Sequence, residues 1–459
     1  MDGECIHPID YRYGSNEMRK IFSREHRLKL LKDVEYNLLK ALIDAEVIKD
    51  HIDLDKVKKA FEETSLEDVK RWENKIHHEM MAIVKAISEK AGSEGKYIHL
   101  GATSNDILDT AMSLQLKEAI SIISSKLKKL INILIKRAWE ERRTPILGRT
   151  HGRAALVTTL GFKLCLYIDE LCRIYEVLNL LRDIFITGKL GGAVGSQVEL
   201  YPKGYEVESK FLEYLKLPKA RFYTQVIPRD RLALLISLLA ILSSVLEHYA
   251  NEIRILQRSE IEELFEPFTR EQVGSSVMPH KKNPVKCERI CGLARIIRGY
   301  VIGVLENIVM EHERDLRNSS FERCIIPEIM LIIDEQLELA IKITEGLVID
   351  QERMLENIRR QEPFIYSDLL LQYATINGAD RQKVHEILRS IFLSCKGRND
   401  CLKAISCNEY LSKYLREEDL KRAMNLSTYV NAAERKVKEF MDSIKHLDFE
   451  FPSVSSQQV

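Results

Sequence analysis

Positions 229–266 read RDRLALLISLLAILSSVLEHYANEIRILQRSEIEELFE, a run of 38 residues without glycine or proline. As one helix this run would be about 57 Å long, at ~1.5 Å per residue. Its most apolar part, 232–246, has 15 residues and includes three serines, which is short of the ~20 residues that span a bilayer. This part is apolar on more than one side, and such a helix must be covered by protein all round. The stretch therefore predicts a long buried helix.

The whole chain is poor in the residues that interrupt helices. Of 459 residues, 11 are proline and 20 are glycine, against usual shares of roughly 5% and 7%. An all-β sandwich needs a turn signal every ~8–12 residues, so this composition argues against one. Lys+Arg and Asp+Glu both number 69, and a chain without net charge has no global field for a polyanion. We therefore expect neither a nucleic-acid nor a membrane partner.

Cysteine usage and the N-terminus bear on the compartment. The nine cysteines lack the histidine or cysteine spacing of a metal site. Residues 1–20 are polar and contain no apolar segment of a signal peptide. An odd number of cysteines without a signal peptide is typical of reduced thiols in the cytosol. We expect a cytoplasmic protein with no metal site.

Helical spacing of apolar residues recurs along the chain. Four more long stretches have it, at 105–142, 153–187, 285–313 and 327–345. Five long helices with short connections predict an antiparallel bundle, and helices that are apolar all round predict that bundles pack together in an oligomer. Shorter helical patterns precede and follow them, at 24–45, 66–90, 351–360, 367–377, 381–394 and 429–444. The predicted fold is all-α, with an N-terminal helical domain (1–100), a central long-helix bundle (101–350) and a C-terminal helical domain (351–459).

The most unusual loop is GSSVMPHKKNP, at positions 274–284 between two of the long helices. Gly274 allows close backbone approach, and consecutive Gly-Ser-Ser amides can form an anion-accepting concavity. Ser275 and Ser276 supply hydroxyls, and Lys281 supplies a cation. By composition alone the segment also fits an ordinary polar loop between helices.

Three further segments combine polar groups with chain geometry that suits a site. In 99–106 (HLGATSND), hydroxyls precede a helix whose first amides attract carboxylate or phosphate, although Ser104 and Asp106 also fit plain helix caps. In 148–152 (GRTHG), a histidine is suited to proton transfer near neutral pH, although a lone loop histidine is more often structural. In 312–323 (HERDLRNSSFER), three arginines suit an anion, although a solvated helix corner looks the same.

In this order the segments resemble the adenylosuccinate lyase family of the fumarase/aspartase superfamily. The loop 274–284 matches the signature Gly-Ser-Ser-x-Met-Pro-x-Lys-x-Asn-Pro at every fixed position. Within the superfamily, the resemblance to the adenylosuccinate lyase family rests on TSNDILDTA (103–111), GRTHG (148–152), TQVIPRD (224–230) and the pair Arg12-Tyr13. The resemblance covers about 11–323. It implies a homotetramer with active sites shared between subunits. It also implies elimination of fumarate from adenylosuccinate and from the succinyl-carboxamide ribotide (SAICAR to AICAR) of purine biosynthesis, without metal or organic cofactor.

The resemblance also implies roles for individual residues. Ser275 is the expected general base, with Ser276 as the alternative, and His151 is the expected general acid. Glu288 is expected to orient that histidine, and Lys281 and Asn283 to stabilise the carbanion. His78 is a second expected catalytic histidine. The expected substrate-binding residues are Arg12, Tyr13, Glu79, His99, Thr103, Ser104, Thr150, Gln225, Ser276, Asn283, Arg289, Arg314, Ser319 and Arg323.

The chain departs from the family pattern in places, and two rivals remain. Glu79 stands where the family usually has Asp, and Arg153 stands where Gln or a small residue is more common. The carboxymuconate cycloisomerase group shares the Pro-His-Lys pattern of the loop but has no phosphate to hold, so the pair Arg12-Tyr13 and the arginines favour the nucleotide lyase. A catalytically silent structural protein on this fold would have lost the catalytic set, which is present here.

Overall fold

The computed structural model describes residues 7–269, 271–278 and 280–452. Helices dominate these residues, and the described strands form two small antiparallel sheets, β1–β2 and β3–β4. The predicted all-α class is confirmed.

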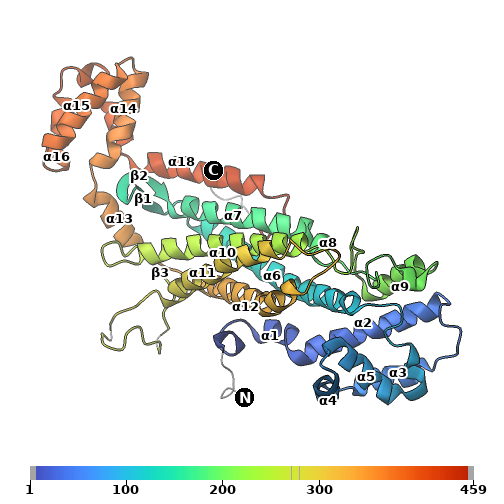
Figure 1. Cartoon of the computed structure of the whole chain (residues 1–459). Helices are drawn as coiled ribbons and strands as arrows, with labels where there is room; N and C mark the ends of the chain where they lie inside the picture. The colour runs from blue at the N-terminus through green and yellow to red at the C-terminus, as the bar shows by residue number, and fades with distance from the viewer. Residues whose placement is uncertain (1–6, 270, 279, 453–459) are drawn as a thin grey trace. The chain divides into compact units, whose positions relative to one another are not determined.

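Each of the five predicted long stretches corresponds to one long helix (Figure 1). They are α6 (Ser104–Glu140), α7 (Leu160–Leu180), α10 (Asp230–Leu256), α11 (Val285–Glu306) and α12 (Arg317–Glu345). By length and composition α10 passes as a membrane span, but 61% of its most apolar 18-residue window is buried in the structure. That burial agrees with the prediction of a covered core helix.

Some predicted helix ends were wrong, for local reasons. Helix α10 ends ten residues early, because a turn follows in which Glu262 adopts φ 54°, and Leu264–Phe265 then forms β3 with β4 (Val348–Ile349). Helix α7 begins late because the preceding residues form a strand. Helix α12 begins at Arg317, so Pro327 lies inside it and not at its first turn. A proline inside a helix lacks one backbone hydrogen bond, and its ring crowds the carbonyl of the preceding turn.

The chain forms two compact units, each built from three separate segments. Unit 1 comprises Met1–Leu127, Ile174–Ser244 and Gly292–Glu338, and unit 2 comprises Lys128–Arg173, Val245–Cys291 and Leu339–Val459. Each of the five long helices contributes residues to both units. The expected division is into three consecutive domains, 1–100, 101–350 and 351–459. The two compact units do not test it, so it stays a prediction.

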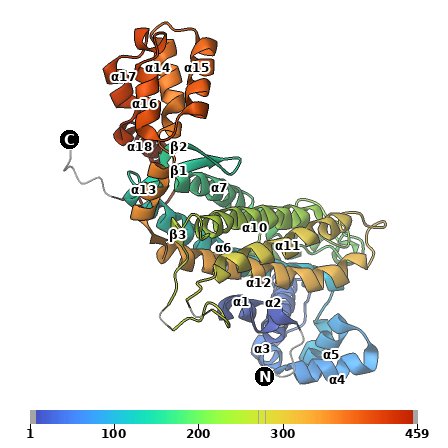
Figure 2. The ribbon, with the colours of Figure 1, turned by 90° about the vertical axis from the view of Figure 1, so that its left-hand side faces the viewer.

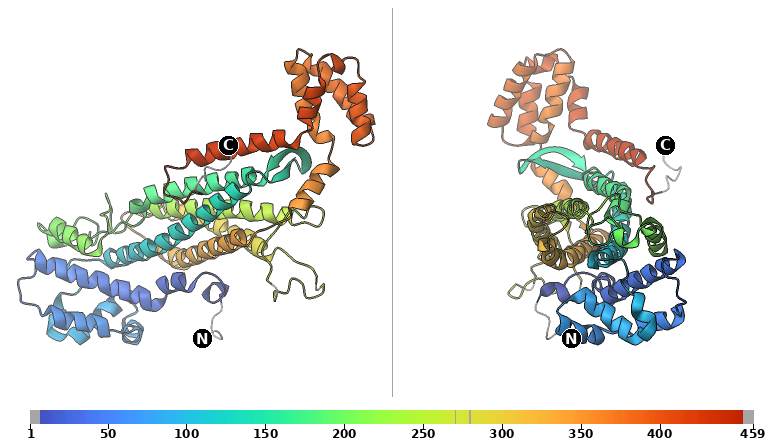
Figure 3. Two further views of the ribbon diagram at one scale, coloured as in Figure 1. Left: turned by 180° about the vertical axis from the view of Figure 1, so that it is seen from behind. Right: turned by 45° about the vertical axis from the view of Figure 1, so that its right-hand side comes forward.

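Unit 1 contains a helical N-terminal region with its own apolar core (blue in Figure 3). Val34, Leu38, Ile87 and Phe211 are fully or almost fully buried there. The predicted helix 66–90 is interrupted, because His77 adopts a left-handed backbone (φ 52°) and ends a helix. The other elements of the unit are η1 (Pro8–Asp10), α1 (Asn16–Ile21), α2 (Arg24–Asp44), α3 (Leu54–Glu63), α4 (Leu66–Ile76), α5 (Glu79–Ala91), η2 (Gly92–Tyr97), α8 (Arg182–Phe185), η3 (Val198–Leu200) and α9 (Gly204–Leu215).

Unit 2 contains a hairpin that was not predicted from the sequence. Strands β1 (Pro145–Thr150) and β2 (Arg153–Thr159) pair antiparallel and are joined by the two residues His151 and Gly152. Both have positive φ, 53° and 72°, as the favoured two-residue hairpin turns require. A helix was predicted from Arg153, so that prediction was wrong for 153–159.

The rest of unit 2 includes a group of short helices, of which α14 to α17 lie together (Figure 2). They bury a second apolar core that includes Tyr366 and Leu411. Cys395 and Cys401 form a disulfide with Cα atoms 5.2 Å apart, so the prediction of reduced thiols was wrong for this pair. The elements are α13 (Gln351–Arg360), η4 (Phe364–Tyr366), α14 (Ser367–Ile376), α15 (Arg381–Ser394), α16 (Arg398–Ser406), η5 (Leu411–Lys413), α17 (Glu417–Ala423) and α18 (Leu426–Ser443).

Candidate active site

The residues expected to form the site fall into both units. Unit 1 holds Arg12, Tyr13, His78, Glu79, His99, Thr103, Ser104, Gln225, Arg314, Ser319 and Arg323. Unit 2 holds Thr150, His151, Ser275, Ser276, Lys281, Asn283, Glu288 and Arg289.

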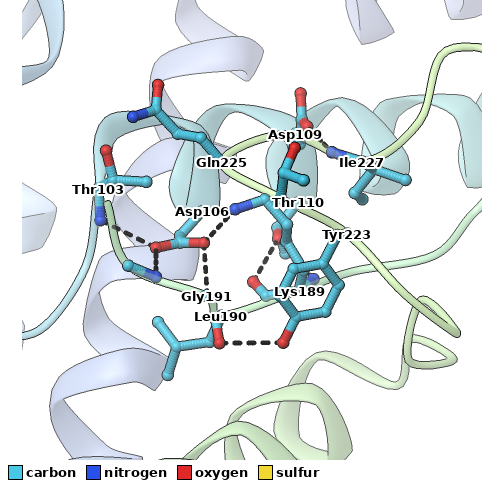
Figure 4. A network of polar contacts seen from close by, with 12 residues as sticks. Thr103, Asp106, Asp109, Thr110, Lys189, Leu190, Gly191, Tyr223, Gln225 and Ile227 are labelled. Carbon is cyan, nitrogen blue, oxygen red and sulfur yellow. Dashed lines mark hydrogen bonds and ion pairs between the residues drawn. The ribbon is translucent and has the colours of Figure 1, made fainter. Parts of the chain in front are cut away.

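In unit 1, Thr103 directly precedes α6 and is tied to a buried carboxylate (Figure 4). Its backbone N–H donates to Asp106 Oδ2 at 2.8 Å. The same carboxylate accepts hydrogen bonds from the N–H of Gly191 at 2.8 Å and of Gly192 at 3.0 Å, and it pairs with Lys189. The capping role considered for Asp106 is therefore confirmed, and the start of α6 is fastened to the segment 189–192.

Gln225 continues this network. Its Nε2 donates to the carbonyl oxygen of Ala193 at 2.7 Å, and its Oε1 accepts from Arg314 Nη1 at 3.0 Å. Thr103, Gln225 and Arg314 are thus joined through the segment 189–193, which was not predicted as part of the site. The available signal was the glycine-rich sequence KLGGAVG at 189–195.

A cavity of about 400 Å³ opens within unit 1. Four expected binding residues line it, namely Glu79, Arg314, Ser319 and Arg323, together with unpredicted residues that include Arg27. Glu79 pairs with Arg27 and, at 2.9 Å, with Arg323. Burial opposes ionisation of Glu79, but the two guanidinium groups outweigh it and lower the pKa of that carboxyl. The cavity wall therefore carries several fixed charges of both signs.

A buried ion network forms another part of the cavity wall. Arg229 donates to both oxygens of Asp109 at 2.9 Å and to Glu322 at 2.8 Å, which joins the start of α10 to α6 and α12. Burial opposes the charged guanidinium, but the two carboxylates raise the pKa of Arg229. Burial, together with the charge of Arg229, lowers the pKa of Arg314. Neither Asp109 nor Arg229 was predicted as a site residue.

Two expected site histidines in unit 1 have distinct surroundings. His99 Nδ1 lies 2.6 Å from Oε1 of the fully buried Glu35. Burial opposes the imidazolium, but Glu35 outweighs it and raises the pKa of His99. His78 caps α5, because its Nδ1 accepts from the N–H of Met81 at 3.2 Å. The His99 ring therefore contacts a buried carboxylate, whereas the exposed His78 ring contacts a backbone N–H.

The pair Arg12-Tyr13 lies in a short segment before α1. The carbonyl oxygen of Tyr13 accepts two hydrogen bonds from Arg19, at 2.9 and 3.2 Å. Two residues later, the N–H of Ser15 donates to the buried Asp334 at 2.7 Å. The backbone is therefore fastened, while the Arg12 side chain is exposed.

In unit 2, His151 lies at the exposed tip of the β1–β2 hairpin. Arg149 donates twice to the buried Glu263, both at 2.8 Å, which anchors the hairpin near its tip. Within the described part of the chain, the His151 ring has no hydrogen-bond partner. Thr150 beside it is also exposed. The hairpin therefore presents the expected general acid to its surroundings.

The Gly-Ser-Ser loop is also in unit 2, and its own backbone organises it. Ser275 Oγ accepts from the N–H groups of Val277 at 3.3 Å and Met278 at 3.0 Å. Asn283 Nδ2 donates to the carbonyl oxygen of Gly274 at 2.8 Å. A Cβ at Gly274 would lie 2.1 Å from the carbonyl oxygen of Lys281, so only glycine permits this closure. Ser276 and the Lys281 side chain are exposed, and Pro279 lies outside the described residues.

The start of α11 holds the far end of this loop. The buried Glu266 accepts from the N–H groups of Lys286 at 2.9 Å and Cys287 at 3.0 Å. A carboxylate at a helix N-terminus is stabilising. Glu288 is exposed on the first turn of α11, beside the half-buried Arg289. Among the described residues, no group of three or more His, Cys, Asp or Glu side chains is arranged to hold a metal ion.

Comparison with solved structures defines the class of the fold. The 3-carboxy-cis,cis-muconate lactonizing enzyme from Pseudomonas putida superposes with a TM-score of 0.86 at 27% identity, covering 95% of this chain and 99% of that one. A fumarate lyase from Mesorhizobium sp. BNC1 superposes with a TM-score of 0.84 at 24% identity, covering 94% and 98%. Residues 13–299 match the family described as Lyase. The predicted fumarase/aspartase-type fold is confirmed, and the chain is an enzyme of the lyase type.

Sequence relatives narrow the class further. The adenylosuccinate lyase of Pyrococcus abyssi is 41% identical over 453 residues, which cover 97% of this chain and 99% of the relative. The enzyme of the same name from Aquifex aeolicus is 37% identical over 416 residues, covering 90% and 94%. The chain belongs to the adenylosuccinate lyase family, as the resemblance of its motifs indicated. The identity to these relatives exceeds the 27% shared with the muconate enzyme, which disfavours the cycloisomerase rival.

Proposed function

We propose that this enzyme eliminates fumarate from adenylosuccinate to leave AMP, and that the same site converts SAICAR to AICAR in purine biosynthesis. The observation that carries the proposal is the cavity in unit 1, where Arg27, Arg314 and Arg323 gather beside Ser319. Guanidinium groups recognise phosphate and carboxylate well. A multiply charged succinyl nucleotide suits such a cavity, and the substrate of the muconate group has no phosphate to place there.

In the proposed reaction, Ser275 removes a proton from the carbon beside a succinyl carboxylate. The two backbone N–H groups that donate to Ser275 Oγ support this role, because donors to an oxygen favour its anionic form. The resulting carbanion is delocalised onto the carboxylate. Lys281 and Asn283 stabilise that charge, and the amides at the start of α6, with Thr103 and Ser104, bind a carboxylate of the succinyl group.

His151 then protonates the departing amino nitrogen as the carbon–nitrogen bond breaks and the double bond of fumarate forms. Glu288 is proposed to orient its ring, since a general acid needs a third group to fix it. His78 assists in positioning the acid. Gln225 contacts the substrate, and the phosphate is held by Arg12, Tyr13, Arg289, Arg314, Ser319 and Arg323. Glu79, His99 and Thr150 line the same site.

The working enzyme is proposed to be a cytoplasmic homotetramer in which each active site draws residues from several subunits. Large apolar side chains on the long helices support assembly, among them Ile241 on α10 and Ile302 and Leu305 on α11, which are 54%, 72% and 49% exposed in the single chain. A helix that is apolar on more than one side needs cover, which another subunit can supply. The exposed positions of His151 and Glu288 agree with partners that come from another subunit.

Product analysis tests the proposed function. Purified enzyme, without added metal and with a chelator present, is expected to convert adenylosuccinate into equal amounts of AMP and fumarate, followed by ultraviolet absorbance and chromatography. SAICAR is expected to give AICAR and fumarate in the same assay. A protein that leaves both compounds intact, but is folded and tetrameric by light scattering, would contradict the proposal.

A further inference from the structure

A buried ion pair lies behind the expected carboxylate-binding end of α6. Asp106 and Lys189 are both fully buried. A buried ion pair is weak support for stability, because the loss of hydration offsets much of the attraction, and apolar residues of similar volume often serve as well. The pair therefore calls for an explanation other than stability.

The contacts of Asp106 supply that explanation. Its Oδ1 accepts from Lys189 Nζ and from the N–H of Gly191, and its Oδ2 accepts from the N–H groups of Thr103 and Gly192 (Figure 4). A carboxylate has about four acceptor positions, so one side chain fixes three backbone amides and an ammonium. An amide side chain in its place would offer a donor where two of these contacts need an acceptor.

The segment 191–193, which Asp106 holds, has little conformational freedom of its own. A Cβ at Gly191 would lie 2.6 Å from the Tyr223 ring, and Gly192 has φ 69°. The next residue, Ala193, accepts the hydrogen bond from Gln225, which in turn contacts Arg314. A shift of the segment 191–193 would therefore move Thr103 and Gln225 together.

We propose that Asp106, with its charge balanced by Lys189, is a positioning residue that sets the affinity of the site for the carboxylate end of the substrate. This inference rests on the proposed function, in which Thr103 and Ser104 take a succinyl carboxylate. Asp106 is enclosed and does not touch the substrate. It acts through Thr103 and through the segment 191–193.

The test compares binding of the two products, fumarate and AMP. The neutral double variant Asp106→Asn/Lys189→Met keeps the volume of the pair and removes the carboxylate that accepts the amides. We expect its inhibition constant for fumarate to rise at least ten-fold and the KM for adenylosuccinate to rise, with kcat and AMP inhibition changed less than about three-fold. Loss of both products' inhibition to the same extent would indicate a merely structural role, and unchanged fumarate inhibition would overturn the proposal.

A matched variant separates positioning from general destabilisation. Glu434→Gln removes a buried carboxylate of α18 that pairs with Arg143, so we expect a lower melting temperature and unchanged inhibition by fumarate. If the double variant does not fold, Gly192→Ala strains the segment with the ion pair intact, because Gly192 has φ 69°, a backbone conformation that residues with a Cβ rarely adopt. The same selective loss of fumarate inhibition is expected, and its absence would refute the inference.

A direct binding measurement tests the positioning role of Asp106 separately from the proposed function. Fumarate binding to wild-type enzyme and to the double variant is measured by calorimetry, without turnover. Wild-type enzyme that binds fumarate but does not cleave adenylosuccinate would contradict the proposed function alone. Active wild-type enzyme and a double variant with equal fumarate affinity would contradict the positioning role alone.

Discussion

Replacement of Arg229 by methionine is expected to destabilise unit 1 strongly, and more at pH 7 than at pH 5. Arg229 is 4% exposed and neutralises Asp109 and Glu322, which are 2% and 9% exposed. Methionine fills a similar volume but leaves both carboxyl groups without their cation. Removal of one partner from a buried ion network costs about 3–5 kcal/mol.

The pH dependence follows from the two carboxyl groups. Burial alone raises the pKa of a carboxyl. In the native protein Arg229 overcomes this at Asp109, whose pKa is lowered, whereas burial still raises the pKa of Glu322. Without Arg229, at least one of them should remain protonated when folded at neutral pH and ionise on unfolding. A raised folded pKa adds stability below the unfolded value, and this stability is lost as the pH rises. For one proton the loss is ~1.4 kcal/mol per pH unit, or about 2.7 kcal/mol from pH 5 to pH 7.

Thermal unfolding at a fixed protein concentration measures both effects. At roughly 2–4 °C per kcal/mol for a unit of 150–250 residues, the variant should melt about 6–20 °C below wild type at pH 7, with a smaller difference at pH 5. Arg435→Met removes an exposed arginine from an ion pair on α18, so it should not shift the melting temperature measurably. A loss below 1 kcal/mol, or a loss that grows toward pH 5, would refute the reasoning.

Three further predictions concern the site itself. Gly274→Ala should reduce kcat at least 100-fold without changing the melting temperature, because the new Cβ would lie 2.1 Å from the carbonyl oxygen of Lys281. The kinetics and the thermal unfolding of this variant are measured together. Normal turnover would contradict the loop closure. Glu79→Gln should strengthen inhibition by inorganic phosphate about five-fold. The substitution removes the repulsion between the Glu79 carboxylate and a phosphate bound beside Arg27 and Arg323, which is ~1 kcal/mol at ~5 Å in water. Weaker inhibition would count against an anion site there. Mixed Ser275→Ala and His151→Ala proteins should recover part of the wild-type activity after subunit exchange, and a mixture that stays inactive would argue against sites shared between subunits.

The sequence predicted the long helices because their apolar pattern runs uninterrupted over many turns. It located the starts of α2 and α13 to the residue. It did not predict the β1–β2 hairpin, because the apolar residues that follow His151 and Gly152 continue the helical spacing of α7. The end of α10 was also missed. Residues 257–266 contain no breaker, and β3 forms there only because β4 pairs with it.

The candidate site was predictable where residue types form motifs, as at Ser275 and Thr103. It was not predictable where a side chain acts through folding partners distant in sequence. Asp106 contacts a segment 83 to 86 residues away, and the partners of Arg229 lie 93 and 120 residues away. Such pairs show no local pattern, because only the packing of the long helices brings them together.

The central claim is that Ser275 starts the elimination of fumarate from adenylosuccinate, and a comparison of two neighbouring serine variants tests it most directly. Ser275→Ala and Ser276→Ala are assayed with wild-type enzyme for fumarate release under identical conditions, after circular dichroism and light scattering have shown equal folding and assembly. We expect wild-type enzyme to release fumarate, Ser275→Ala to lose at least 1,000-fold in kcat, in the upper range of a general base's contribution of ~10²–10⁴, and Ser276→Ala to retain most of the activity. Normal turnover by Ser275→Ala, or no fumarate from wild-type enzyme, would contradict the account.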